Sequence, residues 1–87
     1  MRFEWDPAKA GSNLRKHGVS FDEAVTVFKD PFAFIFDDEA HSEEEDREII
    51  IGMSAVRRMT LVCFVERIED VVRIISASRD AAGNTRL

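Results

Sequence analysis

Four arginines recur among apolar, β-branched residues in the second half of the chain: Arg47, Arg67, Arg73 and Arg79. Arginine binds phosphate oxygens through paired hydrogen bonds, and cationic donors aimed at developing negative charge are usually the largest contribution to such catalysis. If the four side chains share one surface, they could clamp phosphate groups. A solvated or ion-paired sheet surface is the alternative interpretation.

Two further residues are candidates for proton transfer. His17 stands near the end of a predicted helix, and histidine is the side chain that most often acts as a general acid or base. The same position would also let it interact with the last carbonyl groups of that helix. Glu66 precedes Arg67 and could serve as a base, although a surface ion pair is the simpler explanation.

Lys16 and Trp5 are the predicted RNA-binding residues, Lys16 through phosphate and Trp5 by stacking on a base. A solvated helix end and a core or rim aromatic are the corresponding structural interpretations. His41 lies within the acidic run DDEAHSEEED, whose spacing matches neither an EF-hand loop nor a zinc site. We therefore expect no metal ligands and no other cofactor.

The stretch that must position the arginines is residues 47–79. Its three runs, REIIIGMS, MTLVCFVER and VVRIISASR, are rich in β-forming residues and are separated by short connections, which predicts an antiparallel meander. In the first hairpin we expect Met53 opposite Met59. Gly52 is the one glycine inside these runs, which indicates a bulge or a close backbone approach.

In the second hairpin, a turn through residues 68–70 would place Val65 opposite Arg73. The same register, continued without interruption, would place Leu61 opposite Ala77. Directly paired residues share a face of the sheet, and a slip of one residue would move a strand's side chains to the other face.

This register assigns the four arginines to one face, together with Leu61, Ile75 and Ala77. The opposite face would be the packed one. Its members are Ile50, Thr60, Val62, Phe64, Val72, Ile74, Ser76 and Ser78.

The N-terminal half predicts a short strand, RFEW, followed by two helices and a second strand, FAFIFDD. Asp6 and Pro7 are typical of a helix start and Gly18 of a helix end. Ser20 and Glu23 form a capping-box pattern at the second helix. The whole chain, 1–87, therefore predicts one α+β domain with two N-terminal helices packed on a curved antiparallel sheet, and the tail from residue 80 is expected to be irregular.

The formal net charge of −5 comes from one segment. Residues 37–48 hold eight acidic residues and one base, a net −7, whereas the rest of the chain holds nine acidic and eleven basic residues, a net +2. A cationic patch can persist outside that segment because exposed charges are screened beyond about 10 Å at 0.1 M salt. With one cysteine, no recognisable signal peptide and no membrane-length apolar run, we expect a cytoplasmic protein.

Several separated motifs together resemble the BrnT family of toxins from type II toxin–antitoxin modules: FEWDPAKAGSNLRKHGVSFDEAVTVFKDP, HSEEEDREIIIG and RIISASR. The resemblance implies a RelE-like fold and a metal-independent endoribonuclease that inhibits translation and growth. It also implies neutralisation by a BrnA-type antitoxin of ribbon-helix-helix type, through which the pair would bind operator DNA.

One departure from the family pattern concerns the C-terminus. Members usually continue from the last strand into a basic C-terminal helix, which here is short or absent after SASRDAAGNTRL. A catalytically weak antitoxin-binding module that acts as a co-repressor is therefore the alternative function. The shortened end should expose Leu61, Ile75 and Ala77, and we expect that face or its neighbouring edge strand to be covered by the antitoxin, or by a second copy of the chain in isolation.

The second helix gives a prediction that can be tested by stability. Replacing Ser20 with alanine should lower the free energy of unfolding by about 0.5–2 kcal/mol, because the first turn would lose its side-chain cap. Urea denaturation measures the change. An unaltered midpoint would show that Ser20 does not cap the helix.

Overall fold

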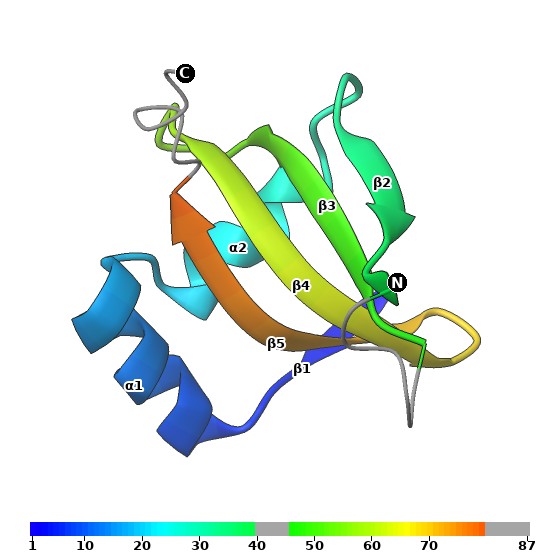
Figure 1. The fold of residues 1–87 in the computed structure, drawn as a ribbon, viewed down its shortest axis with the longest axis horizontal. Helices are drawn as coiled ribbons and strands as arrows, with labels where there is room; N and C mark the ends of the chain where they lie inside the picture. Colours follow the sequence, from blue (N-terminus) through cyan, green and yellow to red (C-terminus); the bar gives the residue numbers. More distant parts are fainter. Residues whose placement is uncertain (40–45, 80–87) are drawn as a thin grey trace.

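The computed structural model describes residues 1–39 and 46–79. Five strands form one twisted sheet in the order β1-β5-β4-β3-β2, with α2 packed behind it and α1 beside β5 (Figure 1). The elements in chain order are β1 (Arg2–Glu4), α1 (Pro7–His17), α2 (Phe21–Val27), β2 (Phe34–Asp37), β3 (Glu48–Met53), β4 (Met59–Ile68) and β5 (Val71–Arg79).

The predicted α+β class, with two N-terminal helices on a curved sheet and a C-terminal meander, is confirmed. The sheet is mixed rather than wholly antiparallel, because β1 pairs in parallel with β5 and places Glu4 beside Arg73. The expectations for a C-terminal helix and for the acidic segment around His41 fall on residues 80–87 and 40–45, outside the described residues. No helix among the described residues is long and apolar enough to cross a membrane.

The predicted helix ends are confirmed. The side chain of Asp6 accepts a hydrogen bond from the Ala8 amide at 2.9 Å, and Gly18 ends α1 in the left-handed conformation, with φ of 71°. At α2, Ser20 Oγ accepts a hydrogen bond from the Glu23 amide at 2.9 Å. The Glu23 side chain turns instead towards the β3–β4 loop, so only one half of the capping box is formed as expected.

The core lies between α2 and one face of the sheet. Phe21, Ala24 and Val27 of α2 pack there with Val19 and with residues of the predicted packed face: Ile50, Val62, Phe64, Val72 and Ile74. At Gly52 an added Cβ would lie 2.8 Å from the Ala33 Cβ. This confirms the predicted close approach, which lets β3 pass under the end of α2.

The expected register is confirmed at Met53–Met59 and at Val65–Arg73. It fails beyond Ile74 because a bulge in β5 makes Ile75 an extra residue, so that Ala77 lies opposite Val62. Ala77 therefore enters the core and is only 1 % exposed. The predicted place of Ala77 beside the arginines is wrong, as is the assignment of Ser76 and Ser78 to the packed face, since the bulge reverses the alternation.

The turn of the second hairpin also differs from expectation. Ile68 pairs with Val71, which leaves a two-residue loop of Glu69 and Asp70, and Arg67 becomes an extra residue in β4. Asp70 has φ of 65°, the left-handed conformation that short hairpin loops require. A two-residue loop and a one-residue bulge thus replace the predicted three-residue turn through residues 68–70.

A buried asparagine joins α1 to the edge of β5. Asn13 Nδ2 donates to the carbonyl oxygen of Ala77 at 2.7 Å and to that of Val19 at 3.0 Å. Its Oδ1 accepts from the Ala77 amide at 3.1 Å. The side chain, in a residue only 6 % exposed, thus takes the place of a neighbouring strand where β1 no longer covers β5.

A second polar cluster ties α2 to the β3–β4 loop. Glu23 Oε2 accepts hydrogen bonds from Ser54 Oγ at 2.7 Å and from Arg58 Nε at 3.0 Å. Arg58 Nη2 also donates to the carbonyl of Gly18 at 2.9 Å. The bonds from Arg58 and Ser54 outweigh partial burial and lower the pKa of Glu23, so the carboxylate is held in its charged form.

Substitutions at Asn13 test the α1–β5 connection. Asn13→Ala should lower the free energy of unfolding by about 2–4 kcal/mol, because three buried backbone groups would lose their partner. Asn13→Asp is nearly isosteric and keeps the acceptor for the Ala77 amide, but it sets a carboxylate oxygen against two carbonyls. It should therefore also destabilise at neutral pH. Chemical denaturation measures both, and an Asp variant as stable as the parent would contradict this account.

The Glu23–Arg58 cluster predicts a pH dependence. Because folding lowers the pKa of Glu23, its contribution is complete above the unfolded-state pKa of about 4.3. It is lost as the pH falls through the lower folded-state value. The stability difference between the parent and Glu23→Gln should therefore shrink on acidification below about pH 4.3. A difference that is constant between pH 7 and pH 3 would show that this pKa is not lowered.

Candidate active site

Arg47 and Arg73 line the same cavity, of about 120 Å³, between α1 and the sheet. Arg47 immediately precedes β3 and Arg73 lies in β5, and their convergence confirms the predicted placement of these two arginines. The remaining lining residues are Asp6, Lys9, Ile74 and Ile75. Three cationic side chains thus meet one carboxylate, which favours an anionic ligand.

Glu4 holds a second pair of arginines together. Its Oε2 lies 3.6 Å from Arg73 Nε and 3.8 Å from Arg67 Nη1. The parallel pairing of β1 with β5 brings Glu4 directly beside Arg73. These partly exposed ion pairs add little stability, but they orient Arg73 and keep Arg67 next to it.

A second cavity, of about 200 Å³, continues along α1. It shares Lys9 and Ile75 with the first, because the bulge turns Ile75 towards the helix. Its other lining residues are Ser12, Asn13, Lys16, His17 and Ser76. We call the two adjoining cavities the α1–β5 groove; it brings the predicted residues Lys16 and His17 into line with Arg47 and Arg73.

Arg79 and Glu66 lie away from this groove. Arg79 pairs with the fully buried Thr60, and its charge acts on Glu23 of α2. It therefore lies on the face of the sheet that α2 covers. The bulge at Ile75 causes this reversal, and the expectation that all four arginines share one face is wrong. Glu66 pairs with the core residue Val72 and also lies on the face that α2 covers.

Trp5 is partly buried at the start of α1. Its ring meets that of Phe21 nearly edge to face, with centroids 5.8 Å apart and an interplanar angle of 82°. The indole therefore packs against the core cluster. This position matches the rim aromatic that was the structural interpretation of Trp5.

Sequence reasoning missed Lys9, Asn13 and Glu4. Lys9, Asn13 and Lys16 are spaced i, i+4 and i+7, which places them on one face of a helix, so this signal was available once α1 was assigned. Glu4 carried no comparable signal. Its role depends on the parallel pairing of β1 with β5, which joins residues about 70 positions apart.

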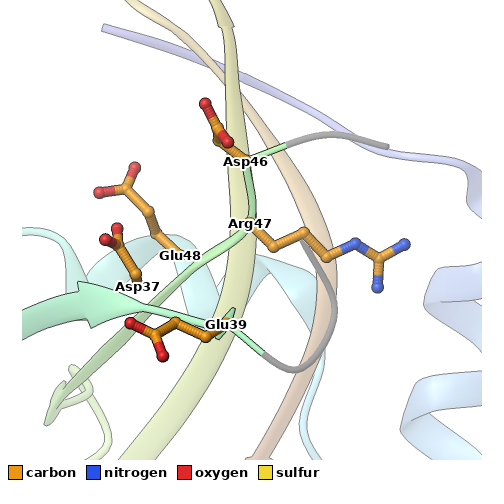
Figure 2. A pocket seen from close by; sticks show the side chains of 5 residues that line it. All are labelled: Asp37, Glu39, Asp46, Arg47 and Glu48. Carbon is orange, nitrogen blue, oxygen red and sulfur yellow. The ribbon is translucent and has the colours of Figure 1, made fainter. Parts of the chain in front are cut away.

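The part of the sheet next to β2 is acidic. Asp37, Glu39, Asp46 and Glu48 line a cavity of about 380 Å³ together with Arg47, whose guanidinium points away from the four carboxylates (Figure 2). Burial and the nearby charge of Asp37 raise the pKa of Glu48. Within residues 1–39 and 46–79, no three His, Cys, Asp or Glu side chains are arranged to hold a metal ion.

Comparison with known proteins supports one family. The fold is similar to the crystal structure of the Brucella abortus ribonuclease toxin BrnT, with a TM-score of 0.71, 23% identity, and coverage of 92% of this chain and 96% of that one. No curated protein matches. Residues 5–83 match the family model described as ribonuclease toxin, BrnT, of type II toxin–antitoxin system. Since this match spans nearly the whole sequence, the chain belongs to the BrnT family of ribonuclease toxins.

Proposed function

We propose that this chain is an active endoribonuclease toxin that binds RNA phosphate in the α1–β5 groove. The observation that carries the proposal is the convergence of Arg47, Arg73 and Lys9 on one cavity. Cleavage of RNA through its own 2′-hydroxyl develops negative charge on the phosphate oxygens, and preorganised cationic donors stabilise that charge best.

The groove supplies the parts that such a reaction needs. Arg47 and Arg73 donate to the non-bridging oxygens, with Arg73 oriented by Glu4. Lys9 and Lys16 bind the scissile and the neighbouring phosphate. Because the guanidinium and ammonium groups provide the positive charge, the reaction requires no metal ion.

Proton transfer is assigned to His17. His17 accepts the proton of the 2′-hydroxyl as the 2′-oxygen attacks phosphorus. The bond from phosphorus to the 5′-oxygen then breaks, and that oxygen takes a proton from water. His17 lines the second part of the groove, next to Lys16, and is exposed at the end of α1, so it can exchange protons with water between turnovers. Glu66 and Arg79 are left out of the catalytic set because they lie on the other side of the sheet.

The partner that controls this activity is proposed to be a BrnA-type antitoxin of ribbon-helix-helix type, which would also bring the toxin to operator DNA. Membership of a type II toxin family supports a protein antitoxin, and the proposed site of action is the cytoplasm. A toxin without activity, which acts only as a co-repressor, is the competing function. The cleavage test below separates the two.

Arg73→Ala should reduce RNA cleavage about 100- to 1000-fold, the usual cost of removing a charge-stabilising donor, and should abolish growth inhibition on expression. Cleavage is measured on a fluorescent single-stranded RNA with EDTA present throughout. The matched control is Arg15→Ala, since Arg15 is exposed on α1 but lines neither cavity of the groove.

The control should retain parental activity, and circular dichroism should show that both variants are folded. Full toxicity of Arg73→Ala would remove that residue from the mechanism. Cleavage that stops in EDTA would contradict the metal-independent reaction. A parent protein that cuts no RNA, yet still binds its antitoxin, would favour the co-repressor.

A further inference from the structure

The edge strand β2 exposes an unusual run of apolar residues. All four of its residues are exposed; Phe34 is 75 % exposed, Ile35 54 % and Phe36 46 %. Small proteins rarely leave contiguous aromatic and aliphatic side chains in water unless the surface serves an interaction. β2 is also the last strand of the sheet order, so its outer edge pairs with no strand in the part of the chain that is described.

The backbone of β2 is arranged to accept another strand. The Asp38 amide donates to the Arg47 carbonyl at 2.9 Å, and this pair continues the β2–β3 register. In an antiparallel ladder hydrogen-bonded pairs alternate with non-bonded ones. The amides and carbonyls of Phe34 and Phe36 thus point to β3, whereas those of Ile35 and Asp37 point outwards.

The side chains of β2 extend an apolar surface on the face of the sheet opposite α2. Phe34 is in register with Ile51, and Ile51 with Leu61. Phe36 and Ile49 form the next row. An added strand would place every second side chain on this face, in contact with Phe34 and Phe36.

The charges near the end of β2 determine which kind of added strand can bind there. Asp37 belongs to the acidic cavity with Glu39, Asp46 and Glu48, where the four carboxylates gather beside β2 and β3 (Figure 2). Like charges here repel a second copy of the same acidic edge, whereas lysine or arginine would relieve their repulsion.

We propose that the outer edge of β2 is a docking site for an extended segment of a partner protein in which apolar residues alternate with Lys or Arg. The segment adds as a sixth strand next to Ile35 and Asp37. Its apolar side chains cover Phe34 and Phe36, and its cations reach the acidic cavity. Arg47 also lines this acidic cavity, so the docking site adjoins the α1–β5 groove. Strand addition does not depend on RNA cleavage; that the partner is the antitoxin rests on the proposed function.

The probe is a blocked seven-residue peptide of alternating lysine and valine, added to the full chain labelled with ¹⁵N. Binding should shift the amide signals of Ile35 and Asp37 more than those of α1. The same peptide with glutamate in place of lysine should bind at least tenfold more weakly. No binding at millimolar peptide, or shifts confined to the α1–β5 groove, would overturn the proposal.

Two substitutions test whether the peptide binds the edge of β2 itself or the residues next to it. Ile35→Pro removes an outward amide, a change that edge strands tolerate, and should weaken peptide binding about tenfold or more. Phe32→Ser is the control, because Phe32 is 85 % exposed in the turn before β2 and lies outside the strand; it should bind as the parent does. An Ile35→Pro variant that binds normally would overturn the proposal.

Sedimentation of the free chain distinguishes a partner protein from a second copy. We expect a monomer at every concentration tested, in place of the self-association expected from the sequence, because the acidic residues beside β2 repel a second copy. A dimer that Ile35→Pro dissociates would show that a second copy occupies the edge and would overturn the assignment to a basic partner. Amide spectra of each variant verify that the rest of the chain remains folded.

Discussion

The hydrogen bonds between Asn13 and Ala77 are the interaction on which the arrangement of this protein depends. β1 is three residues long and pairs only with the first part of β5, so the remaining edge of β5 needs another partner. Unpaired backbone groups in a buried position are costly. The amide of Asn13 offers one donor and one acceptor in the spacing of a strand, and α1 is therefore held against β5 rather than swinging freely on its connections.

This connection sets the composition of the groove. Once Asn13 faces the sheet, Lys9 and Lys16, at i−4 and i+3 on the same helix, must flank it. His17 follows at the helix end. In the groove, the lysines of α1 thus face Arg47 and Arg73 of the sheet, which lie some 30 to 60 residues later in the chain. Electrostatic repulsion among these cations opposes folding, and such a cost is common at sites that bind anions.

The two bulges in the β4–β5 pair determine which side chains reach which face of the sheet. The bulge at Ile75 sends Ala77 into the core and Arg79 to the helix side, so fewer arginines share the groove than a regular strand would provide. The bulge at Arg67 keeps that side chain near Glu4. Arg47, Arg73 and the lysines of α1 thus line the groove, whereas four carboxylates and the exposed Phe34 and Phe36 lie on or next to β2.

The sequence by itself determined the elements and much of the core. Caps such as Asp6 and Ser20 act on amides two or three residues away, and alternation in the strands acts between neighbours, so both are local patterns. The register near the first hairpin was accessible for the same reason. The placement of Arg47 and Arg73 on one face also followed from alternation, because Val65 pairs with Arg73 as expected and no bulge interrupts the pairing of β3 with β4.

Only the tertiary structure decided the parallel pairing of β1, the role of Asn13 and the exclusion of Arg79 from the groove. A bulge costs little in local conformation, and its position depends on whether Ala77 or Ser76 fits beneath the helices. That choice is made by packing volume across the core. Likewise, a buried asparagine is satisfied by backbone groups that meet only after folding. The alternation of apolar and polar residues in the sequence therefore indicates neither the position of the bulge nor the hydrogen-bond partners of Asn13.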